Sequence, residues 1–166
     1  MKRERTNSLA NLRDSRGVTS LNGDGRKYLP TFSDLVDRLC IVQQKMIFLK
    51  DKRDEYVAER ELILHDIDLI LNSLPALSAR AIMAITMLQL SNRCIWESES
   101  KARAGGSEQD KLLKMTHSIN GVRNTAKNIL SEEVGGRKDY KIDALSADLP
   151  PEYGSWNVFE GMEKSE

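Results

Sequence analysis

The chain has 166 residues, of which 40% are hydrophobic, 30% are charged and only 5% are aromatic. This length is enough for one domain with a hydrophobic core, and the composition favours a helical protein over an all-β fold. Lys plus Arg and Asp plus Glu number 25 each, so the bulk charge gives no strong signal for nucleic acid or a membrane surface as the partner.

Residues 1–28 are rich in Ser, Asn, Gly and Arg and show no sustained hydrophobic periodicity. Such a composition predicts a disordered basic arm. After Pro30, either Thr31 or Ser33 can cap a helix that runs to about Leu49. The apolar stripe of this helix has the 4-3-4-3 spacing of a bundle helix and comprises Leu35, Leu39, Val42, Met46 and Leu49.

A second helix is predicted up to Leu74, directly before Pro75, which cannot continue a helix. Its stripe comprises Tyr56, Ile63, Ile67, Ile70 and Leu74. The polar run at residues 50–54 is either a turn between the first two helices or the exposed middle of one long helix. A third helix starts near Ser78 and ends before the glycine pair at residues 105–106, a strong C-terminal stop.

A fourth helix is predicted to open at Ser107, which with Asp110 approximates a capping box, and to end at Gly135. Its stripe comprises Leu112, Met115, Ile119, Val122, Ala126, Ile129 and Leu130. Four amphipathic helices with short connections predict an all-α, antiparallel four-helix bundle over residues 29–136. Residues 137–166 form a tail that contains four aromatic residues. We expect this tail to pack on the bundle or on a partner, because large apolar rings rarely stay solvated.

The third helix carries a stripe in which polar and charged residues follow apolar ones on the same face. The stripe comprises Ile85, Leu88, Asn92, Trp96, Glu99 and Arg103. At about 100° per residue, these positions lie within an arc of roughly 80°. Charges that point into a bundle are unfavourable unless they are paired or hold a ligand. We therefore expect a functional site near the end of this helix.

Antiparallel topology places the end of the third helix beside the end of the first and the starts of the second and fourth. The groups expected to converge there are Lys45, Arg60, Asn92, Trp96, Glu99, Arg103, Asn120 and Arg123. On the fourth helix the polar edge consists of Thr116, Asn120, Arg123 and Lys127. Arginine presents a planar fork to phosphate or carboxylate, and an indole ring can stack on a base or sugar.

The sequence therefore predicts a cationic, Trp-walled pocket that binds a small anionic ligand, such as a nucleotide or a phosphorylated sugar. The alternative is a purely structural network in which Glu99 pairs with Arg60 or Arg103. Under that alternative the chain is a protein-interaction module. Its tail or basic arm would then dock a larger partner.

Two pairs of acids, Asp34 with Asp37 and Asp51 with Asp54, resemble those of all-α, magnesium-dependent nucleotide pyrophosphohydrolases. The resemblance implies a second alternative, an enzyme in which these acids and Glu99 hold Mg²⁺ against a polyphosphate. We expect Asp37 to point away from the apolar seam of its helix. The face with Glu61, His65 and Asp68, and the face with His117, lie opposite their core stripes and are predicted to be solvated rather than metal-binding.

Three sequence strings, taken together, resemble small helical proteins of unknown function from phages and bacterial polysaccharide gene neighbourhoods. They are residues 32–42 (FSDLVDRLCIV) with Lys45, then Asn92-x-x-x-Trp96-Glu97-x-Glu99-x-x-x-Arg103, and Ile119-Asn120-x-x-Arg123-Asn124. The likeness covers roughly residues 31–143. It implies no established activity, but it adds Asn124 to the candidate ligand-binding residues.

Cys40 and Cys94 each lie among apolar residues of predicted helices. This placement is typical of reduced, packed thiols rather than of a disulfide framework. The N-terminus is basic but has no apolar segment of the secretory type, and no apolar run is long enough to span a bilayer. We therefore expect a cytoplasmic protein, with a homo-oligomer as one possible state.

Overall fold

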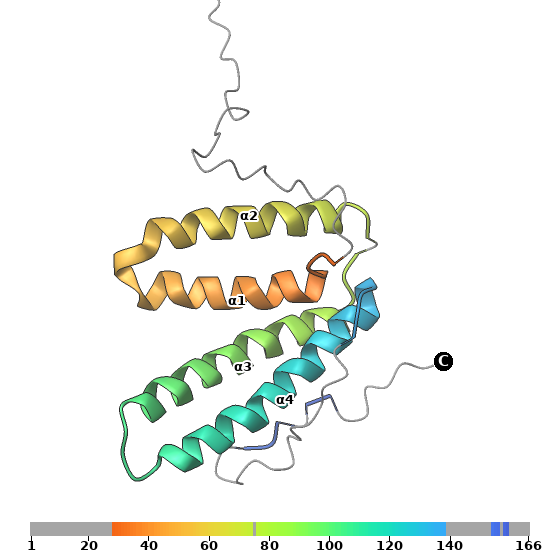
Figure 1. The fold of residues 1–166 in the computed structure, drawn as a ribbon. Helices are drawn as coiled ribbons and strands as arrows, with labels where there is room; N and C mark the ends of the chain where they lie inside the picture. Colours follow the sequence, from red (N-terminus) through yellow and green to blue (C-terminus); the bar gives the residue numbers. More distant parts are fainter. Residues whose placement is uncertain (1–27, 75, 139–153, 157, 160–166) are drawn as a thin grey trace, which may run out of the picture.

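The structure is a computed structural model that describes residues 28–74, 76–138, 154–156 and 158–159. Within these residues the helices are α1 (Phe32–Phe48), α2 (Arg53–Leu71), α3 (Ala79–Arg103) and α4 (Gln109–Val134). A turn of 3-10 helix, η1 (Lys50–Lys52), joins α1 to α2. The predicted all-α fold is confirmed, and consecutive helices run in opposite directions (Figure 1). Residues 1–27 of the predicted arm and most of the predicted tail lie outside the described residues.

Local signals set the starts of α1 and α3. Thr31 caps α1 through a capping box, in which the Thr31 Oγ1 accepts from the Asp34 N–H at 3.2 Å and Asp34 Oδ2 accepts from the Thr31 N–H at 2.9 Å. Ser78 caps α3 by accepting from the Ala81 N–H at 3.0 Å. Both helices therefore begin where the sequence predicted.

The start of α4 differs from the sequence prediction. Ser107 does not cap this helix; Glu108 takes the cap position without a side-chain hydrogen bond. The reason lies in the glycine pair, since Gly105 and Gly106 have φ values of 80° and 124° that only glycine adopts readily. These residues turn the chain out of α3, and the next regular helical residue is Gln109.

α1 is the central helix of the fold. Its Cα atoms come within 8 Å of α2, α3 and α4, whereas α2 approaches only α1 and the short turn η1 among the helical elements. α3 and α4 lie side by side as a second hairpin beneath α1 (Figure 1). The predicted antiparallel four-helix bundle is therefore not confirmed, because α2 does not close it by packing against α3 or α4.

The hydrophobic core lies around α1, where the helices meet. Val42, Leu88, Ile119 and Leu130 are all fully buried in it or beside it. The small side chains of Ala84 on α3 and Ala126 on α4 are also fully buried, and small residues allow neighbouring backbones to approach closely. Trp156 and Phe159 are half-buried against the same core. No helix among the described residues is long and apolar enough for a membrane crossing.

Burial predicts how two leucines two positions apart on α3 differ in their contribution to stability. Leu88 is fully buried and Leu90 is about half exposed. We expect Leu88→Ala to lower the free energy of unfolding by about 2–5 kcal/mol, because it leaves a cavity. The matched control Leu90→Ala is expected to change it by less than about 1 kcal/mol. Urea unfolding followed by circular dichroism measures both; equal losses would contradict the described packing.

Candidate functional site

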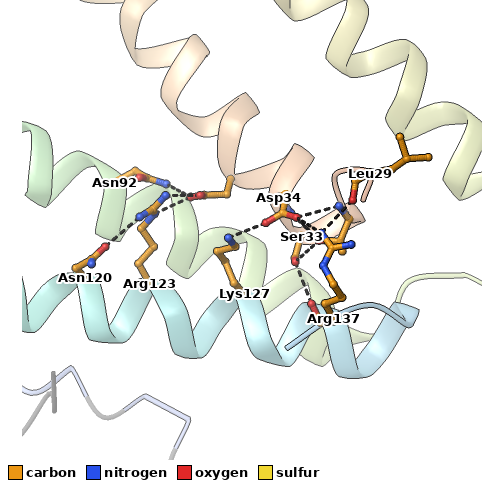
Figure 2. Close-up of polar contacts among 11 residues, drawn as sticks. Leu29, Ser33, Asp34, Asn92, Asn120, Arg123, Lys127 and Arg137 are labelled. Carbon is orange, nitrogen blue, oxygen red and sulfur yellow. Dashed lines mark hydrogen bonds and ion pairs between the residues drawn. The ribbon is translucent and has the colours of Figure 1, made fainter. Parts of the chain in front are cut away.

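A buried ion pair joins the middle of α1 to α4. Arg123 donates from Nε to Asp37 Oδ1 at 2.8 Å and from Nη2 to Asp37 Oδ2, so the two side chains form a bidentate pair. Asn92 of α3 donates to Asp37 Oδ1 at 2.8 Å, and Asn120 accepts from Arg123 Nη1 at 3.0 Å. Figure 2 shows this network of three helices. It brings together three of the nine predicted ligand-binding residues.

Asp37 was predicted to point away from the apolar seam of α1, and it is buried all the same, at 5% exposed. The apolar seam is one of two buried sides of α1. Arg38 forms an ion pair with Glu59 of α2, whereas Ser33 and Asp37 bond to α4. α1 is therefore buried over more than one stripe, and its second side carries polar groups.

The pairing of Asp37 explains why a carboxylate is tolerated in the core. A buried charge is strongly unfavourable alone, but here each carboxylate oxygen accepts at least one hydrogen bond from a neighbouring helix. The Cys40 thiol lies one turn further along α1. Burial, with a smaller contribution from the Asp37 carboxylate, raises the pKa of this thiol to about 12. Cys40 therefore stays protonated at neutral pH and is a poor nucleophile.

A second polar cluster lies one turn towards the start of α1. Asp34 Oδ1 pairs with Lys127 Nζ at 2.8 Å, and Asp34 Oδ2 lies 3.6 Å from Arg137 Nη2. Partial burial raises the pKa of Asp34, but hydrogen bonds from Lys127 and Thr31 outweigh this effect and hold the pKa at about 2. The carboxylate therefore stays ionised at any physiological pH.

These side chains line a cleft of about 360 Å³ between the start of α1 and the end of α4, which we call the Lys127 cleft. Its lining residues are Tyr28, Ser33, Asp34, Lys127, Asn128, Ser131, Arg137 and Lys138. Ser33 and Ser131 share a hydrogen bond of 3.0 Å between their hydroxyl oxygens. Figure 2 shows Ser33, Asp34, Lys127 and Arg137 converging here. Lys127 and Arg137 share the carboxylate of Asp34, whereas Lys138 pairs with Glu132 at 2.8 Å. Two cations on one carboxylate leave this part of the lining net positive.

Local contacts position the cations of the Lys127 cleft. The Lys127 side chain is only 18% exposed and lies one turn after Arg123 on α4. Arg137 donates to the Leu29 carbonyl at 3.0 Å, and its guanidinium stacks over the Tyr28 ring at 3.8 Å. The segment after α4 is thereby held against the segment before α1.

The sequence predicted only some of the residues that line this cleft. Lys127 belongs to the predicted polar edge of the fourth helix, beside Asn120 and Arg123. Arg137 and Lys138 follow the glycine pair that ends this helix, where no periodicity predicts which way a side chain points. The only signal for them in the sequence is two consecutive cations directly after a helix stop.

The end of α3, where the sequence predicted the site, is arranged differently from the Lys127 cleft. Arg103 is 79% exposed and pairs with Glu99 at 2.8 Å, one turn before it on the same helix. The half-buried Trp96 packs near Phe48, with ring centroids 6.3 Å apart. The polar part of the predicted stripe on α3 is therefore buried only at Asn92. It is half-buried at Trp96 and Glu99 and exposed at Arg103.

Two other predicted residues, Lys45 and Arg60, contact side chains of α2. The Lys45 ammonium group lies 5.4 Å from the centre of the Tyr56 ring, and Arg60 pairs with its neighbour Glu61. Asn124 is half-buried on α4. None of the nine predicted residues lines the Lys127 cleft or a second cavity of about 610 Å³ at the turn between α3 and α4. Their role in ligand binding stays a prediction.

The carboxylates proposed for a magnesium site are also dispersed. Asp34 and Asp37 are each paired with cations, whereas Asp51 and Asp54 are exposed around η1. The described parts of the chain hold no group of three or more His, Cys, Asp or Glu side chains placed to bind a metal ion. His65 and His117 are exposed, which confirms the solvated faces predicted for them.

Comparisons with known proteins identify no relative of this chain. The chain matches no protein-family model, no curated protein and no solved structure. The resemblance to phage and polysaccharide-locus proteins therefore stays a prediction.

The central ion pair generates a prediction for a double-mutant cycle. We expect Asp37→Ala or Arg123→Ala alone to lower the free energy of unfolding by about 3 kcal/mol, because each leaves an unpaired charge near the core. The double variant is expected to lose less than the sum of the two, by about 1–3 kcal/mol. Urea unfolding of the four proteins measures this difference. Strict additivity would show that the two groups do not interact.

Asp34 generates a prediction for acid unfolding. Its pKa falls from an ordinary 3.8 to about 2 in the folded protein, so the ionised carboxylate favours folding. This contribution is complete above about pH 5 and is lost as the pH falls from about 4 to 2. The difference in Tm between wild type and Asp34→Asn should therefore shrink over this window. Thermal unfolding followed by circular dichroism tests this, and a difference that persists unchanged at pH 2 would contradict it.

Proposed function

We propose that the protein binds a small phosphorylated ligand, such as a sugar phosphate, in the Lys127 cleft. The observation that carries this proposal is that two cations of the lining, Lys127 and Arg137, share the single carboxylate of Asp34. Arginine and lysine donors form the strongest hydrogen bonds with phosphate oxygens. The proposal keeps the predicted class of ligand but moves the site to the start of α1.

The burial of Lys127 supports a recognition role. Its ammonium group is held in place by Asp34, so it loses little conformational freedom when a ligand binds. Arg137 is more exposed than Lys127, which suits a group that closes over a ligand from outside. The hydroxyls of Ser33 and Ser131 bond to each other at 3.0 Å and are buried in the lining of the cleft.

The size and chemistry of the cleft favour a sugar phosphate over a nucleotide. A volume of about 360 Å³ lies at the small end of ligand pockets, which range from about 300 to 1,000 Å³. The Tyr28 ring, which could stack on a base, is instead stacked on the Arg137 guanidinium. The remaining lining is hydroxyl, amide and charge, which matches a polyhydroxylated ligand.

Calorimetry with inorganic phosphate and a hexose phosphate tests the proposal. We expect Lys127→Met to weaken binding by about tenfold to a hundredfold, because a charge-assisted hydrogen bond is worth about 1.5–3 kcal/mol. Asp34→Asn is expected to strengthen binding, since it removes a negative charge that competes for the same cations. The folded state of each variant is checked by circular dichroism.

The matched control is Arg103→Met, which removes an exposed cation at the end of α3. This change should leave the affinity unaltered under the present proposal. Loss of binding in Arg103→Met but not in Lys127→Met would instead support the Trp-walled site predicted from the sequence. A wild-type protein that binds neither phosphate nor the hexose phosphate at millimolar concentration would refute the proposed function.

A further inference from the structure

The outer side of α2 is exposed throughout the described structure. α2 packs against α1 through Ile63 and Ile67, which are buried, and it approaches neither α3 nor α4. On its other side Leu62 is 72% exposed and Leu69 is 60% exposed. Leu62 and Leu69 therefore lie on the solvent-facing side of α2, seven residues apart.

These leucines belong to a regular row of side chains on α2 that lies outside the hydrophobic core. The pattern has the 4-3-4-3 spacing of a helix that packs on another helix, and we call it the outer seam. The outer seam comprises Ala58, Leu62, His65, Leu69 and Asn72, all of which are exposed. This spacing places a row of side chains on one helix face, with its two large apolar members one heptad apart.

Acidic side chains flank the outer seam on both sides. The exposed carboxylates of α2 are Asp54, Glu55, Glu61, Asp66 and Asp68. Two of these carboxylates are offset, since Arg60 pairs with Glu61 and Lys52 Nζ lies 3.9 Å from Glu55 Oε2. Arg53 instead donates to the Met46 carbonyl of α1 at 2.7 Å. The remaining carboxylates, Asp54, Asp66 and Asp68, leave the rim of the outer seam net negative.

The negative charge of this rim determines which kind of partner can bind at the outer seam. A second copy of the chain that docked through the same seam would bring acidic rims together, and like charges across an interface are unfavourable. A helix with leucine-type residues on one face and lysine or arginine beside them would complement both features. Helices of this kind commonly dock on an apolar groove with charge-matched edges.

We infer that the outer seam of α2 is a docking surface for a basic, amphipathic helix of a partner protein. The apolar residues of the partner pack between Leu62 and Leu69. Its cations pair with Asp66 and Asp68 at the rim. This surface is separate from the Lys127 cleft, so the inference does not depend on the proposed function.

The experiment uses the full chain and a synthetic amphipathic peptide of about 20 residues, with leucine at the seam positions and lysine beside them. Fluorescence anisotropy measures its binding at salt concentrations of about 0.05 and 0.5 M. We expect a Kd of about 10 µM at low salt and at least tenfold weaker binding at high salt. A matched peptide with glutamate in place of lysine should not bind.

Substitutions on the outer seam separate docking from general attraction between charges. Leu62→Ser with Leu69→Ser should weaken peptide binding at least tenfold without lowering Tm, since both side chains are largely exposed. Asp66→Asn with Asp68→Asn should reduce the salt dependence. The control Leu113→Ser, which changes an exposed leucine on α4, should leave binding unaltered.

Three results would overturn the inference. The first is the absence of binding, or binding that the two serine substitutions leave unchanged. The second is a dimer in analytical ultracentrifugation that the same substitutions dissociate, because the occupant would then be a second copy. The third is a rise of tenfold or more in peptide affinity when Arg13 and Arg16 are changed to glutamate. Such a rise would identify the basic N-terminal segment of the chain as the occupant.

Discussion

The ion pair between Asp37 and Arg123 is the interaction on which the arrangement of this protein depends. It joins residues 86 positions apart and ties the middle of α1 to α4, with Asn92 of α3 on the same carboxylate. A buried carboxylate is tolerated only while these partners are in place, so the pair fixes both the position and the rotation of α1. Slippage of α1 against α4 would leave two charges unpaired. The hydrophobic core alone would not penalise such a shift to the same degree.

The rotation of α1 also creates the Lys127 cleft. Asp34 lies almost one turn before Asp37 on α1, and Lys127 lies one turn after Arg123 on α4. Once the central pair is formed, the second acid and the second cation are brought together at 2.8 Å. The central pair is closed and serves structure. The pair of Asp34 and Lys127 lines a cleft where Arg137 adds a further positive charge. The contacts between α1 and α4 therefore include both a structural ion pair and a candidate binding site.

The same central position of α1 leaves α2 with a free side. α1 turns one side to α3 and α4 and another to α2, so α2 attaches through a single side that includes the buried Ile63 and Ile67. In a closed four-helix bundle a second side of α2 would be buried as well. Its absence here explains how Leu62 and Leu69 remain exposed on a helix that is otherwise rich in charge. The fold thus separates two candidate surfaces, a cationic cleft at the α4 end and an acidic, leucine-containing face on α2.

The sequence alone determined the local features of this protein. Capping residues located the starts of α1 and α3, and periodicity placed Arg123 and Lys127 on one edge of the fourth helix, because these signals act over a few residues. Tertiary structure alone decided that Asp37 is buried and that Asp34 meets Arg137. Periodicity shows which face of a helix is apolar, but it does not show how many neighbours that helix has. The number of neighbours buried a second side of α1, exposed the end of α3 at Arg103, and set the partners of each charge.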